Sequence, residues 1–309
     1  MSPVPHLRLG TRRSPLALAQ AEEARTRLCA AHGWPPDAVE IVPVTATGDR
    51  IQDRPLAEIG GKALWTKELD ACLVDGRIDL AVHSLKDVET IRPAEIAIAA
   101  VLPREDVRDV LLGAASIRAI PEGARVGTSA PRRAAQMLNR RPDVAIVPIR
   151  GNVATRIAKR AAGEADVTLL AAAGLARLGE SGVGTPLEVE DWLPAPSQGA
   201  IAVECRTGDA TTRALLAAID HAPSRAEVMA ERALLAALGG SCRSPIAVLT
   251  HYRGDHLALT CALYSADGVE KVEGTASVAV GDGEGPARLA ADLLARASPG
   301  IAALFDGAA

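Results

Sequence analysis

The stretch that decides the fold is Arg125-Val126-Gly127-Thr128-Ser129-Ala130-Pro131-Arg132-Arg133, in which a short apolar strand runs directly into a helix. Proline fits the first position of a helix, because the N–H that it lacks would have no partner there. A second stretch, Thr11-Arg12-Arg13-Ser14-Pro15, follows the apolar residues Leu7 to Leu9 in the same way, and Ser14 is a good N-cap. The free N–H groups and the helix dipole make both turns receptive to anions. Two such units favour two related α/β halves, and if the halves face each other across a cleft, both turns can reach one ligand.

The first half of the chain alternates apolar strands with helical patterns, which is typical of α/β proteins. We expect strands at residues 7–9, 39–44, 79–82, 110–112, 125–127, 144–148 and 167–171. We expect helices at residues 16–32, 62–75, 131–139 and 153–162. A Pro-rich turn and a strand at residues 194–204 indicate a return of the chain to its first part. From residue 223 the pattern becomes that of a small α+β unit, with helices at 223–238 and 286–297 and strands at 246–250, 257–263 and 269–278.

Composition excludes several classes of protein. The 309 residues are 48% hydrophobic, which argues against disorder, but only 2% aromatic, which leaves few stacking platforms for nucleic-acid bases. The formal net charge of -4 also disfavours nucleic acid as a partner. No apolar run approaches the roughly 20 residues that span a bilayer, and residues 1–20 show no signal-peptide pattern, so we expect no membrane partner.

The cysteines and histidines indicate neither a disulfide framework nor a metal site. There are five cysteines, an odd number, and no pair has CxxC spacing. The six histidines form no HxxxH or HExxH pattern. This usage fits a reducing cytoplasm, and we expect no metal.

Arginine is concentrated in one part of this acidic chain. Guanidinium groups suit planar anions, because their fork of donors matches a carboxylate or phosphate bidentately. The chain has no GxxxxGK[ST] phosphate loop, so a polycarboxylate is as good a ligand as a phosphate. The arginines at predicted strand ends and helix starts are the candidate ligand-binding ones: Arg12, Arg13, Arg132, Arg133, Arg150, Arg156 and Arg177. We expect Arg140, Arg141 and Arg160 to form a solvated surface.

Two further residues can do chemistry. Cys242 lies in a predicted loop after Gly239 and Gly240 and before Arg243, and a neighbouring cation favours the thiolate. The alternative is a small hydrophobic residue packed under the loop, which is what we expect of the other four cysteines. Asp87 follows an apolar strand at the edge where α/β sheets gather catalytic groups, although it could instead form a surface ion pair with Lys86.

Taken together, these motifs resemble the porphobilinogen deaminases, also called hydroxymethylbilane synthases. The resemblance runs from about Leu7 into the C-terminal unit and thins after about Leu263. The residues that carry it are Thr11 to Ala17, Gly60-Gly61-Lys62, His83 to Val88, Arg104-Glu105-Asp106, Gly127-Thr128-Ser129 with Arg132-Arg133, Arg150 to Val153, Ala173-Gly174-Leu175 with Arg177-Leu178-Gly179, Gln198-Gly199-Ala200 and Gly240-Ser241-Cys242.

The resemblance implies an α/β fold of two lobes like those of type 2 periplasmic binding proteins around a cleft, plus a small α+β C-terminal domain. The domains would be residues 1–102 with 197–221, residues 103–196, and residues 222–309. The implied enzyme is a transferase that joins four porphobilinogen molecules head to tail, loses ammonia each time and releases hydroxymethylbilane. It would be a cytoplasmic monomer whose partner is a small-molecule substrate.

The resemblance also implies roles for individual residues. A dipyrromethane cofactor would be held by a thioether to Cys242, and Asp87 would be the catalytic residue, contacting pyrrole N–H groups and stabilising the azafulvene-like cation. The residues implied for cofactor binding are Lys86, Ser129, Arg132, Arg133, Arg156, Gln198 and Gly199. Those implied for substrate binding are Arg12, Ser14, Arg150, Arg177 and Lys62. Residues 45–62 would form a lid that excludes water.

Some positions depart from the commoner bacterial pattern of that family, notably Ser197, which replaces a glycine before Gln198. The other departures are Ala130-Pro131, Trp65, Ala176 and Val107.

Two other interpretations of the function compete with this one. A solute-binding protein for a carboxylated metabolite would use the same lobes, but it leaves Cys242 unexplained. A cysteine hydrolase pairing Cys242 with His251 has only proximity in the sequence to support it.

Overall fold

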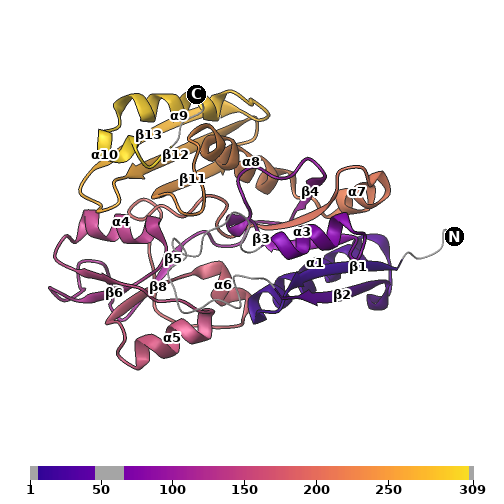
Figure 1. Cartoon of the computed structure of the whole chain (residues 1–309), viewed down its shortest axis with the longest axis horizontal. Coiled ribbons are helices and arrows are strands. Elements are labelled where there is room, and N and C mark those ends of the chain that lie inside the picture. Colours follow the sequence, from indigo (N-terminus) through magenta and orange to yellow (C-terminus); the bar gives the residue numbers. More distant parts are fainter. Residues whose placement is uncertain (1–5, 46–65, 306–309) are drawn as a thin grey trace. The chain divides into compact units, whose positions relative to one another are not determined.

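Residues 6–45 and 66–305 are described by the computed structural model (Figure 1). Their contacts divide them into two units. Unit 1 comprises residues 6–45, 66–105 and 200–225, and unit 2 comprises residues 106–199 and 226–305. Each unit has its own sheets and core.

Unit 1 is built on a five-stranded sheet of order β2-β1-β3-β10-β4. Its strands are β1 (Leu7–Arg12), β2 (Val39–Val44), β3 (Leu80–Ser84), β4 (Ile96–Val101) and β10 (Ile201–Arg206). The pairs β1–β2 and β1–β3 are parallel, and β10 is antiparallel to both β3 and β4. The helices are α1 (Pro15–His32), α3 (Lys67–Val74) and α7 (Ala210–Leu216), with short 3-10 turns η1 (Pro36–Ala38), η2 (Leu85–Asp87) and η3 (Ala217–Ile219). Side chains of α1 and the sheet, such as Leu28, Leu9 and Val203, form one buried core.

The first part of unit 2 repeats this arrangement with a sheet of order β7-β6-β8-β5-β9. Its strands are β5 (Asp109–Leu112), β6 (Arg125–Gly127), β7 (Ala145–Val147), β8 (Val167–Ala171) and β9 (Thr185–Pro186). The pairs β6–β7 and β6–β8 are parallel, and β5 is antiparallel to β8 and β9. The helices are α4 (Pro131–Arg140), α5 (Val153–Ala161) and α6 (Ala172–Arg177).

The similarity between the two sheets extends to one arginine–aspartate pair in each. In unit 1, Asp79 accepts hydrogen bonds from the Arg8 backbone N at 2.8 Å, Nε at 3.2 Å and Nη2 at 3.0 Å. In unit 2, Asp166 accepts from the same three atoms of Arg125 at 2.7, 3.3 and 3.0 Å. Each aspartate comes directly before the strand that pairs with the arginine's own strand. The predicted pair of related halves is therefore present as two sheets with the same strand order and the same anchoring pair.

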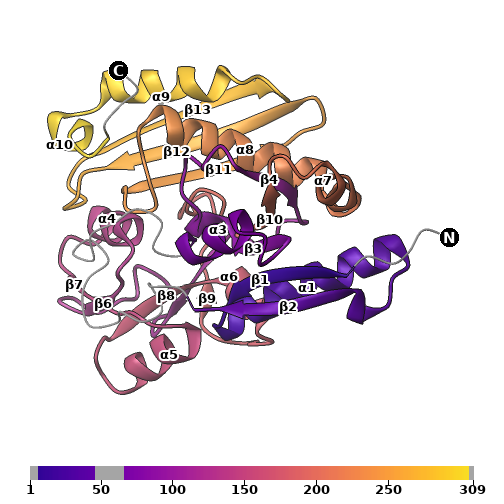
Figure 2. The ribbon, with the colours of Figure 1, turned by 45° about the vertical axis from the view of Figure 1, so that its right-hand side comes forward.

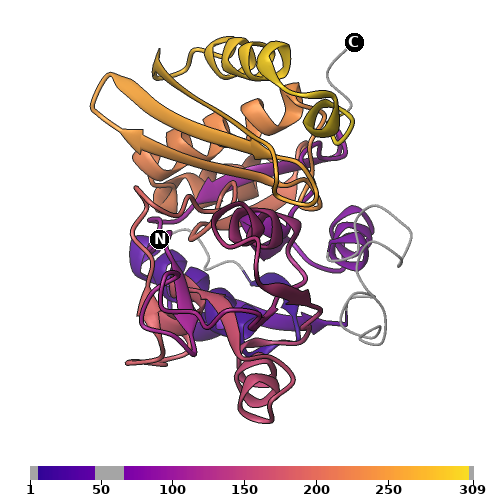
Figure 3. The same cartoon turned by 90° about the vertical axis from the view of Figure 1, so that its left-hand side faces the viewer.

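The C-terminal part of unit 2 is a three-stranded antiparallel sheet, β11 (Ile246–Tyr252), β12 (His256–Tyr264) and β13 (Lys271–Ala279), with most of α8 (Ala222–Ala237) and with α9 (Gly285–Arg296) and α10 (Pro299–Ala302). Figures 2 and 3 show α9 lying along this sheet. Leu234 of α8, Val248 and Leu259 of the sheet and Leu293 of α9 belong to one buried core.

The opposite face of this sheet packs against α4, so the two parts of unit 2 share a boundary. Ala247, Ala262 and Tyr264 contact Ala135 there. Asn139 Nδ2 donates to Gly268 O at 2.8 Å, which ties the end of α4 to the turn before β13.

The predicted fold class is confirmed: two α/β sheets of like topology and a small α+β region. The sequence located the centres of most elements because apolar periodicity and the caps agree. Ser14 Oγ accepts from Ala17 N at 3.3 Å, as expected of an N-cap. The strands β4 and β9 and the helices α6, α7 and α10 were not predicted. The short helix α6 contains Gly174 and Arg177, where only a strand-to-helix junction was expected. Residues 62–65 of the predicted helix at 62–75 lie outside the described residues, and α3 begins at Lys67.

Candidate active site

In unit 1, the turns that follow β1 and β3 line one hollow of the surface. Arg12 and Ser14 come from the β1–α1 turn, and Asp87 comes from η2 after β3. Gln20 of α1 and Ser84 bridge the two elements, with Gln20 Nε2 2.7 Å from Ser84 Oγ. The structure thus brings together three predicted site residues, a guanidinium, a hydroxyl and a carboxylate. Lys86 lies on η2 beside Asp87 and is partly buried.

A buried charged network lies beside this hollow. Glu204, in the middle of β10, is fully buried, and its Oε2 lies 3.2 Å from Nε2 of His83, which also lines the hollow. Arg92 donates Nε and Nη2 to the two oxygens of Glu204, each at 2.8 Å. It also donates to Asp70 and Glu89 at 2.5 and 2.7 Å. Burial raises the pKa of Glu204, but His83 and Arg92 lower it by more, to about 2.

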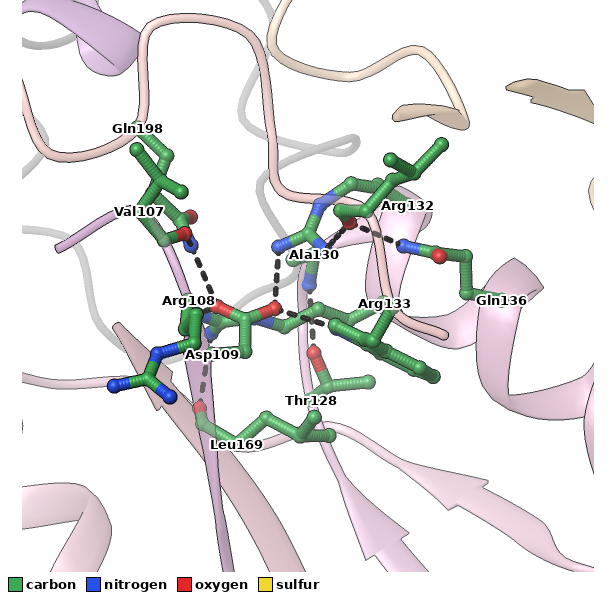
Figure 4. A network of polar contacts seen from close by, with 12 residues as sticks. Val107, Arg108, Asp109, Thr128, Ala130, Arg132, Arg133, Gln136, Leu169 and Gln198 are labelled. Atoms are coloured by element: carbon green, nitrogen blue, oxygen red, sulfur yellow. Dashed lines mark hydrogen bonds and ion pairs between the residues drawn. The ribbon is translucent and has the colours of Figure 1, made fainter. Parts of the chain in front are cut away.

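In unit 2, the charged residues gather around one buried carboxylate, that of Asp109 at the start of β5 (Figure 4). Arg133 holds it with Nε at 3.2 Å and Nη2 at 2.7 Å, and Arg132 adds Nη2 at 2.8 Å. The two guanidinium groups also donate to backbone carbonyls, Arg132 to Leu193 O at 3.0 Å and Arg133 to Leu169 O at 2.9 Å. Burial raises the pKa of Asp109, but the charges of Arg132 and Arg133 lower it by more. The pKa lies below its usual range, so the carboxylate is ionised.

Two neutral donors complete this group, which we call the Asp109 cluster: Asp109, Arg132, Arg133, Trp192 and Gln198. Trp192 Nε1 donates to Oδ2 of Asp109 at 2.8 Å, and Gln198 Nε2 donates to Oδ1 at 2.9 Å. Gln198 also donates to Val107 O at 2.7 Å. Three predicted site residues, Arg132, Arg133 and Gln198, therefore converge on an aspartate that was not singled out from the sequence.

The backbone around Gln198 is held from two sides. Ser197 has a φ of 61°, the left-handed region that favours glycine, and its N–H donates to Glu231 Oε2 of α8 at 2.6 Å. Glu231 is itself fully buried and also accepts from Thr250 N at 3.1 Å. Arg177 Nη2 donates to Gly199 O at 2.9 Å. Predicted residues Arg177 and Gly199 are thus in direct contact.

The remaining predicted residues of unit 2 lie on the turns after β6 and β7. Ser129 Oγ donates to Ile149 O at 3.0 Å, linking the two turns. Arg150 is partly buried in the second turn, and Arg156 on α5 donates Nε to Gly151 O at 2.9 Å.

Cys242 lies on the loop between α8 and β11. Its thiol is exposed, whereas the other four cysteines of the chain are buried. A turn shapes the loop, with Ser244 N donating to Ser241 O and Ser241 N donating to Ser244 Oγ, both at 3.0 Å. The alternative in which this cysteine packs beneath its loop is wrong, because the residue is exposed.

Some expectations were wrong or fall outside the structure. Arg141 is not a solvated side chain, because its Nη1 donates to Ile117 O at 3.0 Å and Ile120 O at 2.6 Å. Arg140 is exposed, as expected, and also donates to Asp191 O, whereas Arg160 is half-buried and donates to Asp166 O. Lys62, and all but the first residue of the predicted lid at 45–62, lie outside the described residues.

Asp109, Glu204 and Glu231 were missed because a sequence does not show which charges are paired. The signal was present for two of them: Asp109 adjoins the apolar run at 110–112, and Glu204 interrupts the one at 201–205. Acidic residues are almost never fully buried without a partner, so each predicted a hidden cation.

Among residues 6–45 and 66–305, no helix is long and apolar enough to cross a membrane. Over the same ranges, the structure contains no group of three His, Cys, Asp or Glu side chains that could hold a metal ion.

Comparisons with known proteins give a consistent result. Residues 7–214 match the family model described as "Porphobilinogen deaminase, dipyromethane cofactor binding domain", and residues 225–296 match "Porphobilinogen deaminase, C-terminal domain". The chain is 58% identical to a porphobilinogen deaminase of Sphingopyxis alaskensis, over 97% of this chain and 96% of that protein. It is 51% identical to one of Paracoccus denitrificans, over 86% of each. Among solved structures, the L-cystine solute receptor of Neisseria gonorrhoeae shares only a distant likeness, with a TM-score of 0.38 and 15% identity over 69% of this chain and 85% of that one.

Proposed function

The chain belongs to the porphobilinogen deaminase family, and from that premise we propose which of its residues hold the cofactor and the substrate. The enzyme joins porphobilinogen molecules head to tail in tetrapyrrole biosynthesis, four per product, and releases hydroxymethylbilane. Each condensation forms one carbon–carbon bond and breaks one carbon–nitrogen bond, and ammonia leaves. The protein must therefore hold an anionic, growing chain and stabilise positive charge where the carbon–nitrogen bond breaks.

We propose that Cys242 carries the dipyrromethane as a thioether. Its exposed thiol supports this, because a cysteine that forms a covalent link must be reachable, and the four other cysteines are buried. Gly239, with a φ of 66°, ends α8 and lets the chain turn into the loop that presents the thiol. When bound, the dipyrromethane supplies the primer on which the product is built.

The observation that carries the proposal for unit 2 is the pairing of two buried arginines with one carboxylate. Asp109 is the only acidic side chain within ion-pair distance of Arg132 or Arg133 among the described residues, so the cluster keeps one net positive charge. A buried charge is costly unless it is paired, so this site favours an anionic ligand. The carboxylates of the cofactor fit that requirement, and Arg132 and Arg133 are at the start of α4, where the helix dipole adds to the attraction.

Further cofactor contacts are proposed for residues around this cluster and beside Asp87. These are Ser129, Arg156, Gln198, Gly199 and Lys86. Arg12, Ser14, Arg150 and Arg177 are proposed to bind substrate carboxylates, and Lys62 is proposed from the resemblance alone. The side chains of these residues offer guanidinium, ammonium, amide or hydroxyl donors to the carboxylate oxygens of cofactor and substrate, and Gly199 offers its backbone N–H.

Asp87 is the proposed catalytic residue. It shares its hollow with Arg12 and Ser14, so a substrate whose carboxylate meets that guanidinium would bring its pyrrole ring near the Asp87 carboxylate. A fixed carboxylate can accept a hydrogen bond from the pyrrole N–H and stabilise the positive charge that develops as ammonia leaves.

We also propose that the enzyme works as a monomer in the cytoplasm. The odd number of cysteines and the absence of CxxC spacing support a reducing compartment. Size-exclusion chromatography with light scattering would test the first part, since a dimer would elute at twice the chain mass.

Intact-mass spectrometry tests the cofactor assignment. Protein purified from cells should exceed its sequence mass by two linked pyrrole units, and Cys242→Ser should abolish the excess. Cys261→Ser is the matched control, because that thiol is fully buried in the C-terminal sheet, and it should keep the excess. Protein that lacks the excess but still consumes porphobilinogen would disprove the assignment.

A further inference from the structure

The Asp109 carboxylate has more donors than a simple ion pair needs. Arg133, Arg132, Trp192 and Gln198 all donate to its two oxygens, over distances of 2.7 to 3.2 Å. Asp109 is fully buried, and the two arginine side chains are 6% and 5% exposed. Side chains held by several short bonds in a buried site have little rotational freedom, so this carboxylate fixes where both guanidinium groups lie.

The two arginines differ in how many donors they have left. Within the described residues, Arg133 donates from Nε, Nη1 and Nη2. Arg132 donates from Nη1 and Nη2 but has no bond from Nε there. A guanidinium carries five N–H groups, so Arg133 keeps two of them for a ligand and Arg132 keeps three, Nε–H included. The position of Arg132 depends on its single bond to Asp109 and its single bond to Leu193 O.

The repeat between the two units shows that the fold does not require this cluster. Pro15 and Pro131 each begin the helix that follows the first parallel strand of their sheet. In unit 1 this proline is followed by Leu16 and Ala17. In unit 2 the two corresponding positions are occupied by Arg132 and Arg133. Unit 1 forms the same strand order without charges at these positions. The two buried arginines and their aspartate therefore serve something other than the sheet topology.

We propose that Asp109 is a positioning residue for the dipyrromethane: it holds Arg132, with Arg133, in the arrangement that receives the cofactor's carboxylates. This rests on the proposed function of Arg132 and Arg133. Positioning the two arginines is a different role from neutralising their positive charge. A negative charge beside an anion site weakens anion binding by itself, so removing it would strengthen binding if charge alone mattered. If placement matters more, removing it weakens binding.

The first experiment measures cofactor occupancy in Asp109→Asn by intact mass. The amide has the same shape but places an NH2 group against a guanidinium donor, so one arginine loses its partner. We expect the fraction of chains carrying the two-pyrrole excess to fall at least tenfold. Asp166→Asn is the matched control, because it also breaks an Arg–Asp pair in unit 2 but at an exposed site, and it should keep wild-type occupancy.

A second pair of variants separates placement from charge and covers the case in which Asp109→Asn does not fold. Arg133→Gln alone leaves Asp109 and Arg132 with no net charge, whereas Asp109→Asn/Arg133→Gln restores the wild-type charge of one. Positioning predicts that the double variant carries at least tenfold less cofactor than Arg133→Gln. Equal or higher occupancy in the double variant would overturn the proposal, as would full occupancy in Asp109→Asn or a matching loss in Asp166→Asn. If wild-type protein itself lacks the mass excess, the proposed function fails instead.

Discussion

Glu204 and Arg92 form a bidentate ion pair in unit 1, with Nε to Oε1 and Nη2 to Oε2 both 2.8 Å apart. The pair is buried, and Glu204 sits in the central part of β10, which joins β3 and β4. Since β3 leads into the turn that bears Asp87, this buried pair stabilises the strands next to the proposed active site. The contribution of the Glu204–Arg92 pair should be visible in the pH dependence of the free energy of unfolding.

We expect Glu204→Gln to lower the free energy of unfolding at pH 7 by about 3 kcal/mol, because it breaks a buried pair by removing one partner. The pKa of Glu204 is lowered to about 2 from an unfolded value of 4.5. Its contribution is therefore fully present above pH 4.5 and is lost as the pH falls toward 2. Urea unfolding between pH 5 and pH 2.5 should show a steep loss of stability in the wild type and a shallower one in the variant.

Glu188→Gln is the control for this prediction, since Glu188 pairs with Arg108 but its side chain is 65% exposed. Exposed pairs contribute little, so its slope should match that of the wild type. A Glu204→Gln slope that equals the wild-type slope would show that the buried pair does not govern acid unfolding.

Much of the fold could be predicted from the sequence, because its signals were local. Ser14 and Pro15 mark the start of α1, and the apolar run at 167–171 corresponds to β8 without any long-range information. The strand β4 at Ile96–Val101 was not predicted, although its residues are apolar. It pairs only with β10, about 100 residues away, and no nearby turn marks it as a strand.

The candidate site was less predictable, for a related reason. Cys242 and Asp87 stood out by their positions next to glycines or after a strand, and Arg132 and Arg133 by their place at a helix start. Asp109 did not, because its importance comes from contacts with Trp192 and Gln198, which are more than 80 residues away. Hydrogen-bond partners at such separations are set by tertiary packing, which a single sequence does not reveal.

Asp87→Asn should nearly stop ammonia release while leaving the cofactor attached. The neutral amide cannot stabilise a developing positive charge as a carboxylate does, and loss of one such group costs roughly 10²- to 10³-fold in rate. Ammonia release and intact mass should be measured on the same preparation. Asp37→Asn, an exposed carboxylate in η1, should release ammonia at the wild-type rate. Near-normal turnover in Asp87→Asn would mean that Asp87 is only a surface charge.

Ser197→Gly should stabilise the protein. The φ of 61° strains a residue with a Cβ by roughly 1–2 kcal/mol, and the Ser197 hydroxyl is buried without a hydrogen-bond partner in the described residues. Glycine relieves both costs and keeps the N–H that donates to Glu231. We expect a gain of about 1 kcal/mol, measured by thermal and urea unfolding. Ser181→Gly, at an exposed position without a positive φ, should give no gain. A loss of stability in Ser197→Gly would indicate that the hydroxyl has a use that outweighs the strain.

Gly268→Ala should weaken the packing of α4 against the C-terminal sheet. Gly268 has a φ of 73°, and a Cβ there would meet Ala135 O and lie 2.8 Å from Leu138 Cβ, both on α4. Since Arg132 and Arg133 lie in the first turn of α4, its displacement should also disturb the Asp109 cluster. Gly254→Ala isolates backbone strain, because Gly254 has a φ of 80° but a methyl group at its Cα would have nothing within 4 Å. We expect Gly254→Ala to cost about 1 kcal/mol and Gly268→Ala at least twice that, with a lower cofactor occupancy only in the latter. Equal losses in the two variants would mean that the chain can shift at Gly268 without cost, and that the contact between α4 and this turn does not hold the cluster in place.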